Sequence, residues 1–350
     1  MRIAQVAPLF ERVPPVTYGG TERVVAYLTD ALVELGHDVT LFASGDSRTR
    51  AKLVSAAPRS LRLDTARRDT MAPQILELDQ VSRMAHRFDV IHFHTGFLHL
   101  PMARQLPAAT VTTMHGRLDI DELAPLMQDV ADAPFVSISN HQRLPYPAQN
   151  WCATVYHGLP PRLLPFQLAT GDYAAFVGRI SPEKRVDRAI EIARRAGLEL
   201  RIAAKIDEAD REYYEREIAH LMTQPHVRYL GEIGEAEKAE LLGGARALLF
   251  PIDWPEPFGM VVIEALSCGT PVLAWPEGSV PELIEPWVNG WIVDSIEAAV
   301  EALAHADAID RRACRATFEK RFTAERMARD YVAVYKRLRD TTRGFEARTA

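Results

Sequence analysis

The stretch WPEPFGMVVIEALSCGTPVLAW, residues 254–275, is almost wholly apolar and yet contains two glutamates, Glu256 and Glu264, with seven residues between them. The pattern predicts a strand over residues 247–250, then a loop, then a helix over residues 259–267, with Glu264 about two turns inside it. Because a buried carboxylate needs hydrogen-bond donors, Glu264 in an apolar run indicates a functional site.

The start of this predicted helix is a candidate binding site as well. The first turn of a helix has unpaired N–H groups and the positive end of the helix dipole, which suit a phosphate or a sugar hydroxyl. The residues at this start are Phe258, Gly259, Met260 and Val261. We predict that Glu256 accepts hydrogen bonds from a sugar and Glu264 from a ribose. The alternative is that Glu256 is a helix-start charge and Glu264 a solvated position.

Short strands alternate with helices on both sides of this stretch. One series of predicted strands covers residues 2–7, 38–42, 90–93, 110–114 and 135–139, and a second covers residues 173–177, 198–203, 227–229, 247–250 and 271–274. Between the first two strands, ERVVAYLTDALVEL (22–35) has apolar residues at helical spacing, and Gly36 is expected to end that helix. Such alternation predicts an α/β fold of two doubly wound, Rossmann-like domains that bind ligand in the cleft between them.

The chain of 350 residues is long enough for two domains. HGLPPRLLPFQLATGD, residues 157–172, contains three prolines and is predicted to be the interdomain linker. We place an N-terminal domain at residues 1–160, a C-terminal domain at 161–325, and a returning helix and tail at 326–350.

Composition excludes some classes of partner and predicts a location. A net charge of −6 offers no bulk attraction to nucleic acid. Three widely spaced cysteines are typical of a reducing compartment, and the N-terminus resembles a strand more than a signal peptide, so the cytoplasm is expected. No transmembrane segment is predicted, since the longest apolar run is interrupted by Glu264, Gly269 and Pro271. The sequence makes no prediction about the oligomeric state.

Two cations follow the first strand of the C-terminal domain. Arg179 ends that strand, and Lys184 lies five residues further on, in a turn with Pro182. An arginine fork and a lysine ammonium at the carboxyl end of a strand can together clamp a diphosphate. The alternative is that both are surface charges beside Glu183 and Asp187.

These motifs resemble those of retaining GT-B glycosyltransferases, specifically glycosyltransferase family 4. The match includes the Glu–seven-residue–Glu signature in EPFGMVVIEALSCGTPV. Three further segments resemble the same family: FVGRISPEKRVDRAIEIA (176–193), YGGTERVVAYLTDALVELGHDVTLF (18–42) and SVPELIEPWVNGWIVD (279–294). Together they extend over nearly the whole chain.

The resemblance implies transfer of a hexose from a nucleotide sugar, UDP-glucose by preference, with retention of configuration, front-face attack and neither metal nor cofactor. It assigns Gly19 and Gly20 to the donor diphosphate and places His115 and Glu256 at the transferred sugar. The turn formed by Gly231, Glu232 and Ile233 is assigned to the nucleotide base. The acceptor, whether a glycan, a glycolipid or a small molecule, is expected on the N-terminal domain, and the C-terminal helix is expected to pack back toward that domain.

Several alternatives stay open at this level. A sugar-nucleotide 2-epimerase and a non-catalytic nucleotide-sugar binder share the fold. His92, His94 and His99 allow either a metal site or a buried cluster. Asp119 and Asp121 form an Asp-x-Asp triplet like the metal ligands of the other glycosyltransferase fold, but they follow the wrong kind of element, so we expect no metal there.

Overall fold

The computed structural model divides into two units by its internal contacts, Met1–Gly158 with Ala324–Ala350 (unit 1) and Leu159–Thr323 (unit 2). The described residues are 1–16, 19–62, 64 and 69–349, with side chains up to residue 341. Tyr18, the first residue of the predicted glycine-loop motif, lies outside them.

Unit 1 contains, among its described residues, a sheet of seven strands in the order β3–β2–β1–β4–β5–β6–β7. The strands are β1 (Arg2–Val6), β2 (Asp38–Phe42), β3 (Lys52–Val54), β4 (Val90–Phe93), β5 (Ala109–Thr113), β6 (Phe135–Ser137) and β7 (Trp151–Thr154). All pairs are parallel, and Ile3 of β1 lies opposite Val39 on one side and Val90 on the other. The strand order reverses between β1 and β4, so ligands are expected beyond the carboxyl ends of these two strands.

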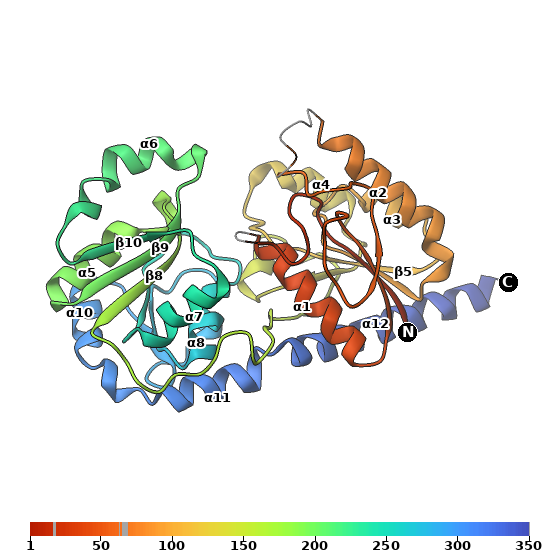
Figure 1. The fold of residues 1–350 in the computed structure, drawn as a ribbon. Helices are drawn as coiled ribbons and strands as arrows, with labels where there is room; N and C mark the ends of the chain where they lie inside the picture. Colours follow the sequence, from red (N-terminus) through yellow and green to blue (C-terminus); the bar gives the residue numbers. More distant parts are fainter. Residues whose placement is uncertain (17–18, 63, 65–68, 350) are drawn as a thin grey trace. The chain divides into compact units, whose positions relative to one another are not determined.

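The helices of unit 1 bury apolar faces on this sheet. They are α1 (Gly20–Glu34), α2 (Met71–Met84), α3 (Leu100–Ala103), α4 (Ala124–Asp129) and α12 (Ala324–Thr349), with 3-10 turns at Ala85–Arg87, Asp121–Leu123 and His141–Arg143. α12 comes from the end of the chain and packs against α1, β4 and β5 (Figure 1). Its buried face includes Met327, Tyr331 and Tyr335, which are each 0% exposed. This face anchors the returning helix to unit 1, as predicted.

Unit 2 contains, within the described part of the chain, a parallel sheet of six strands in the order β10–β9–β8–β11–β12–β13. The strands are β8 (Tyr173–Arg179), β9 (Glu199–Lys205), β10 (Val227–Gly231), β11 (Leu248–Phe250), β12 (Val272–Ala274) and β13 (Gly290–Ile292). The strand order reverses between β8 and β11, which are hydrogen-bonded neighbours. The two cations and the Glu256 loop follow these two strands.

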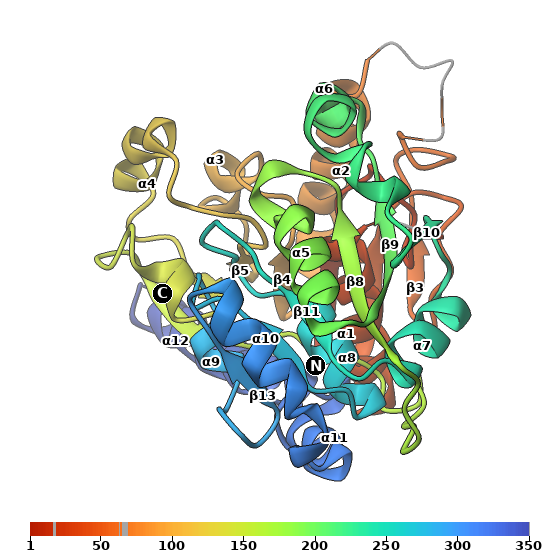
Figure 2. The same ribbon diagram turned by 90° about the vertical axis from the view of Figure 1, so that its left-hand side faces the viewer.

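Helices cover both faces of this second sheet. They are α5 (Val186–Ala196), α6 (Arg211–Tyr213) with a π-helical continuation (Tyr214–Ile218), α7 (Glu235–Gly244), α8 (Met260–Cys268), α9 (Val280–Leu283), α10 (Ile296–Ala304) and α11 (Arg311–Arg321). Short 3-10 turns occur at Pro182–Lys184, Glu208–Asp210, Leu221–Thr223 and Ala306–Ala308. α5 and α10 lie on one face of the sheet and α7 and α8 on the other (Figures 1 and 2).

The ten predicted strands are confirmed with shifts of at most a few residues at their ends. The sequence analysis missed β3, β7 and β13, which are edge strands of three or four residues. As edge strands they are less buried than central strands of similar length such as β11, so the apolar pattern of their sequences is weaker. The predicted helix over 259–267 is α8, but Glu264 is its fifth residue and therefore lies just over one turn inside it, not two.

The predicted linker over residues 157–172 is mostly part of unit 2. The chain passes from one unit to the other between Gly158 and Leu159. Beyond that point Leu164 is fully buried, and the backbone N–H of Gln167 donates to the carbonyl of Cys268 at 3.0 Å. The prolines of this segment thus shape a packed loop.

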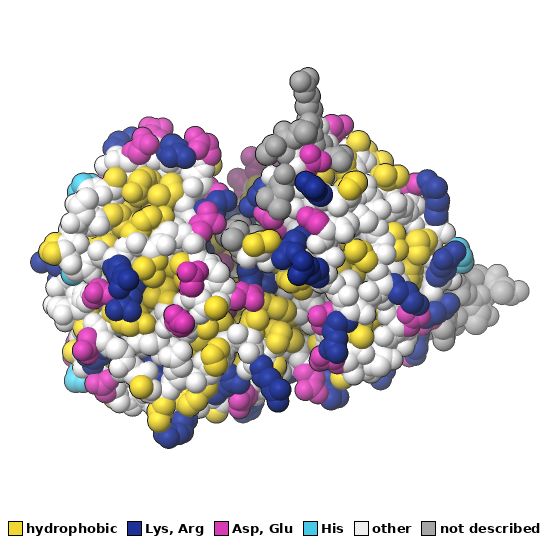
Figure 3. Space-filling view, in the orientation of Figure 1, with side chains coloured by type: hydrophobic (Ala, Val, Ile, Leu, Met, Phe, Trp, Pro, Cys, Tyr) yellow, Lys and Arg dark blue, Asp and Glu magenta, His cyan; other side chains and the backbone are white. Residues whose placement is uncertain are grey.

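The surface shown in Figure 3 has lysine and arginine side chains interspersed with aspartate and glutamate, without a broad region of one sign. Among the described residues, no helix combines the length and the apolar character that a membrane span requires.

Candidate active site

The candidate site of unit 2 begins where β8 and β11 end. Lys184 lies in the turn after β8, and Glu256 lies in the loop between β11 and α8. Since the carboxyl ends of neighbouring parallel strands meet at one edge of a sheet, residues that are 72 positions apart come into contact there.

Glu256 and Lys184 form an ion pair at this edge. The ammonium of Lys184 donates to Oε2 of Glu256, and the indole Nε1 of Trp254 donates to the same oxygen at 3.0 Å. The Lys184 ammonium also lies 4.7 Å from the centre of the Trp254 ring. The side chains of the pair are only 16% and 13% exposed. A residue predicted to bind the sugar and one predicted to bind the diphosphate are therefore in direct contact.

Arg179 has a different set of partners. Its guanidinium lies 2.8 Å from a carboxylate oxygen of Glu183, 3.6 Å from one of Asp207 and 3.8 Å from one of Asp210. The sequence analysis predicted that Arg179 and Lys184 together clamp a diphosphate. Its alternative was that both are surface charges beside Glu183 and Asp187. Arg179 has the contact with Glu183 that the alternative described, while Lys184 contacts Glu256.

Glu264 is buried, with 4% of its surface exposed, so the alternative of a solvated position is wrong. Its carboxylate accepts from the ammonium of Lys238, which lies on α7 and is itself 13% exposed at the side chain. Lys238 supplies the donor that burial of the carboxylate requires. Sequence reasoning missed Lys238 because a lysine in a charged helix carries no signal of its buried partner.

Gly259 precedes α8 with φ of 82°, in the left-handed region that glycine adopts without strain. Phe258 is buried, and Met260 and Val261 begin the helix. The N–H of Val262 donates to the carbonyl of Gly259 at 3.0 Å, and the positive end of the helix dipole at this start suits an anion.

The turn after β10 also has a glycine in the left-handed region. Gly231 has φ of 71°, and Glu232 and Ile233 follow it. α7 then begins with the N–H of Gly234 donating to Glu237 at 2.8 Å. The backbone of this turn therefore leaves the sheet at the carboxyl edge, next to β9.

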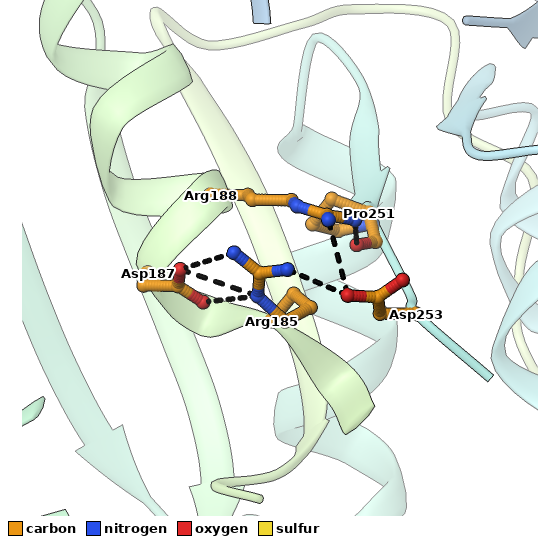
Figure 4. Close-up of polar contacts among 5 residues, drawn as sticks. All are labelled: Arg185, Asp187, Arg188, Pro251 and Asp253. Carbon is orange, nitrogen blue, oxygen red and sulfur yellow. Dashed lines mark hydrogen bonds and ion pairs between the residues drawn. The ribbon is translucent and has the colours of Figure 1, made fainter. Parts of the chain in front are cut away.

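A cluster of charged side chains joins the Lys184 turn to the Glu256 loop (Figure 4). Asp253 accepts from Arg185 at 2.7 Å and from Arg188 at 3.1 Å. Arg188 also donates to the carbonyl of Pro251, and Arg185 holds Asp187 through bonds of 2.8 to 3.2 Å. We call this group the loop clamp. The sequence analysis did not identify it.

In unit 1, Gly19 and Gly20 lie between β1 and the first turn of α1. Gly19 has φ of 149°, and a Cβ there would lie 2.9 Å from Cβ of Pro15, so only glycine fits. Gly20 has open space at the same position. The backbone of Gly20 can therefore be approached closely by a ligand.

His115 follows β5 and belongs to a group of histidines. Its Nε2 lies 2.8 Å from Nδ1 of His94, and its ring stacks on that of His157 with centroids 5.2 Å apart. The Nδ1 atom of His115 is shielded from solvent and has no hydrogen-bond partner among the described residues. Burial lowers the pKa of His115 to about 3, so its ring is neutral.

The other histidines are held by protein groups. His92 contacts Tyr335 and Thr113, both at 2.7 Å, and His99 contacts Thr112 at 2.7 Å. The described residues contain no group of three or more His, Cys, Asp or Glu side chains arranged to hold a metal. The geometry of these rings is that of a buried hydrogen-bonded cluster.

The Asp-x-Asp triplet lies apart from these groups. Both carboxylate oxygens of Asp119 accept from Arg117, at 2.8 and 2.7 Å, and this pairing lowers the pKa of Asp119. Asp121 begins a 3-10 turn two residues on.

Comparison with solved structures identifies the class of fold. The chain matches a solved glycosyltransferase of avilamycin A biosynthesis with a TM-score of 0.73 and 26% identity, covering 97% of this chain and 98% of that one. It also matches Anabaena HepE, solved with UDP and glucose, with a TM-score of 0.74 and 16% identity over 96% and 99% of the two chains. The fold is that of the GT-B glycosyltransferases.

Residues 18–159 match the family described as Glycosyltransferase Family 4, and residues 167–318 match that described as Glycosyl transferases group 1. The chain belongs to glycosyltransferase family 4.

Curated relatives share part of the chain. O-antigen chain mannosyltransferase B of Escherichia coli is 24% identical over 49% of this chain and 48% of its own length. D-inositol 3-phosphate glycosyltransferase of Streptomyces scabiei is 31% identical over 39% of this chain and 33% of its own. The chain thus spans about half or less of the length of these relatives.

Proposed function

We propose that this protein is a retaining hexosyltransferase that transfers glucose from UDP-glucose to an acceptor without a metal ion. The observation that carries the proposal is the Lys184–Glu256 pair at the switch point of unit 2, with the start of α8 beside it in sequence. A cation and a hydrogen-bonding carboxylate at this position suit the diphosphate and the sugar of one nucleotide sugar.

The division of roles follows from charge. Lys184, Arg179 and the N–H groups at the start of α8 would stabilise the negative charge that develops on the leaving diphosphate, a contribution of several kcal/mol in comparable sites. Arg179 would exchange some of its carboxylate contacts for the phosphate. Glu264 would accept from the ribose, Glu256 from the sugar, and the backbone at Gly231, Glu232 and Ile233 would contact the base.

Unit 1 would contribute Gly19 and Gly20 to the diphosphate and His115 to the transferred sugar. The choice of UDP-glucose is supported by Anabaena HepE, which has the same fold and has been solved with UDP-glucose. Relatives named as an O-antigen chain mannosyltransferase and as a D-inositol 3-phosphate glycosyltransferase support transfer of a sugar to an acceptor.

Incubation of the full chain with UDP-glucose tests the proposal against its alternatives. A hexosyltransferase should slowly release UDP and glucose when no acceptor is present, because water replaces the acceptor. Appearance of a different sugar nucleotide would show a 2-epimerase. Tight binding with unchanged UDP-glucose after long incubation, with acceptor mixtures added, would show a non-catalytic binder.

A further inference from the structure

His115 lies at the end of a chain of buried hydrogen bonds that begins on the returning helix. The side-chain amide of Gln5 donates from Nε2 to the hydroxyl of Tyr335 at 3.0 Å. The other end of the amide, Oε1, lies 2.8 Å from Nε2 of His94, and Nδ1 of His94 lies 2.8 Å from Nε2 of His115. Gln5 and Tyr335 are fully buried, and His94 is 3% exposed, so water does not interrupt the chain.

The donors and acceptors along this chain determine where each proton is. The carbonyl oxygen of Gln5 can only accept, so Nε2 of His94 must carry a hydrogen. Burial holds the pKa of His94 well below its usual range, so the ring is neutral and its Nδ1 is a bare acceptor. Nε2 of His115 must therefore carry the hydrogen between the two rings. Because His115 is neutral as well, its remaining atom, Nδ1, has a free lone pair.

This remaining atom is the one that has no partner. Nδ1 of His115 is shielded from solvent, and no described residue donates to it. A buried acceptor without a partner is unfavourable, because it has lost its hydrogen bond to water, and native proteins seldom retain one without a reason. Because the atom is shielded, a ligand hydroxyl reaches it only when the side chains around it move, and its hydrogen bond would then recover that loss.

We propose that Tyr335, Gln5 and His94 are positioning residues that fix His115 as the Nε2–H tautomer, so that its Nδ1 accepts a hydrogen bond from a hydroxyl of the transferred sugar. The proposal rests on the proposed function for the identity of the hydroxyl. It assigns α12 a role in the site: Tyr335 orients the Gln5 amide, and this orientation sets every proton as far as His115.

The opposite orientation of the Gln5 amide would give the other tautomer of His115 and would contradict the proposal. If the Gln5 amide were rotated by 180°, its NH2 group would face His94, and each donor in the chain would become an acceptor. His115 would then present an N–H from Nδ1. The hydroxyl of Tyr335 also lies 2.7 Å from Nδ1 of His92. When it donates its single hydrogen to His92, it can only accept from the Gln5 amide, so Tyr335 and His92 together select the first arrangement.

The direct test is the nitrogen NMR spectrum of the full chain labelled with 15N-histidine, without substrate. His115 is assigned by the signals that disappear in His115→Gln. We expect a protonated signal for Nε2 and an unprotonated signal for Nδ1. A protonated Nδ1 would overturn the proposal. This spectrum does not require activity, so it tests the tautomer of His115 independently of the proposed function.

The role of α12 is tested with a matched pair of variants. Tyr335→Phe removes the hydroxyl that orients Gln5, and we expect mixed tautomers of His115. We expect kcat to fall by about twofold for an equal mixture and by about tenfold for full reversal, with the KM for the donor little changed.

Tyr173→Phe is the control, because it removes a buried hydroxyl of unit 2 that donates to the carbonyl of Leu241 at 2.9 Å and has no contact with the relay. It should lose similar stability but keep the wild-type nitrogen spectrum and kcat. If Tyr335→Phe also keeps the wild-type tautomer, or if both variants change it equally, the relay is refuted. Wild-type protein that shows the expected tautomer but never releases UDP would contradict the proposed function alone.

Discussion

The two glutamates of the signature each have a lysine partner from a different element. Glu256 pairs with Lys184 of the turn after β8, and Glu264 pairs with Lys238 of α7. All four side chains are largely buried, so removing one partner leaves an uncompensated charge. The UDP affinities and activities of these variants must therefore be compared with each other as well as with the wild type.

Substitution of the glutamates should separate their roles. Glu256→Ala should abolish transfer while UDP still binds with nearly unchanged affinity, because the sugar is the only part of the donor that the carboxylate is proposed to contact, and Lys184 remains to bind the diphosphate. Glu264→Ala should weaken UDP by about 1–3 kcal/mol, since hydrogen bonds to a charged group are lost. Calorimetry with UDP on both variants makes the comparison. Equal losses of UDP affinity would contradict the division of roles.

Arg179 and Lys184 should act on the phosphates despite their separate partners. We expect Arg179→Ala and Lys184→Ala to weaken UDP by about 1–3 kcal/mol and uridine much less, because only UDP carries the charge. Fluorescence or calorimetric titration with both ligands measures the difference. Arg194→Ala, which removes an exposed arginine of α5 that pairs with Glu191, is the control and should change neither affinity. Similar losses for UDP and uridine would show that the cations are structural.

At the scale of elements, the loop clamp joins the turn after β8 to the loop after β11. Arg185 has φ of 52°, and among the described residues only Trp287 is another non-glycine with positive φ. An arginine in this region costs about 1–2 kcal/mol relative to glycine. Its bonds to Asp187 and Asp253 offset that cost and hold the two loops that contain Lys184 and Glu256 (Figure 4).

Arg185→Gly should therefore separate stability from function. Glycine accepts the backbone conformation, so the melting temperature should stay within about 2–4 °C of the wild type, while the donor kcat/KM should fall about fivefold to tenfold. Asp253→Asn should reproduce the loss of kcat/KM. Trp287→Gly relieves the same kind of backbone strain outside the clamp and should leave kcat/KM unchanged. An Arg185→Gly variant with wild-type kcat/KM would show that the clamp does not position the site.

At the scale of the whole molecule, two sheets each reverse their strand order at a point where polar groups gather. Unit 1 has Gly20 after β1 and the histidine cluster after β4 and β5, and unit 2 has the paired lysines and glutamates. In the proposed mechanism, cations and helix N–H groups take the place of a metal, and no described residue is assigned as a base that would activate an acceptor from the opposite face of the sugar.

This arrangement predicts both metal independence and stereochemistry. Activity should persist in excess EDTA, because Lys184, Arg179 and the start of α8 neutralise the diphosphate. An α-linked donor should yield an α-linked product, because the acceptor approaches on the side of the leaving group. A transfer assay in EDTA, followed by NMR of the new anomeric proton, measures both. Loss of activity in EDTA would return Asp119 and Asp121 to consideration as ligands, and a β-linked product would contradict front-face attack.

The sequence by itself determined the class of fold and indicated which charged residues form the candidate site. Strand and helix periodicity are local properties, so the two α/β series and the start of α8 could be predicted from neighbours along the chain. The burial of Glu264 also followed from its apolar surroundings. Edge strands such as β3 were not predicted, because an exposed edge lacks the continuous buried run that identified the equally short β11.

The tertiary structure alone decided which side chains meet. The pairing of Lys238 with Glu264, the clamp between Arg185 and Asp253, and the relay from Tyr335 to His115 join residues that are 26 to 330 positions apart along the chain. Such contacts depend on strand order and helix packing, which bring distant segments to one edge of a sheet. A single sequence contains the charges of these residues but no record of the distances between them.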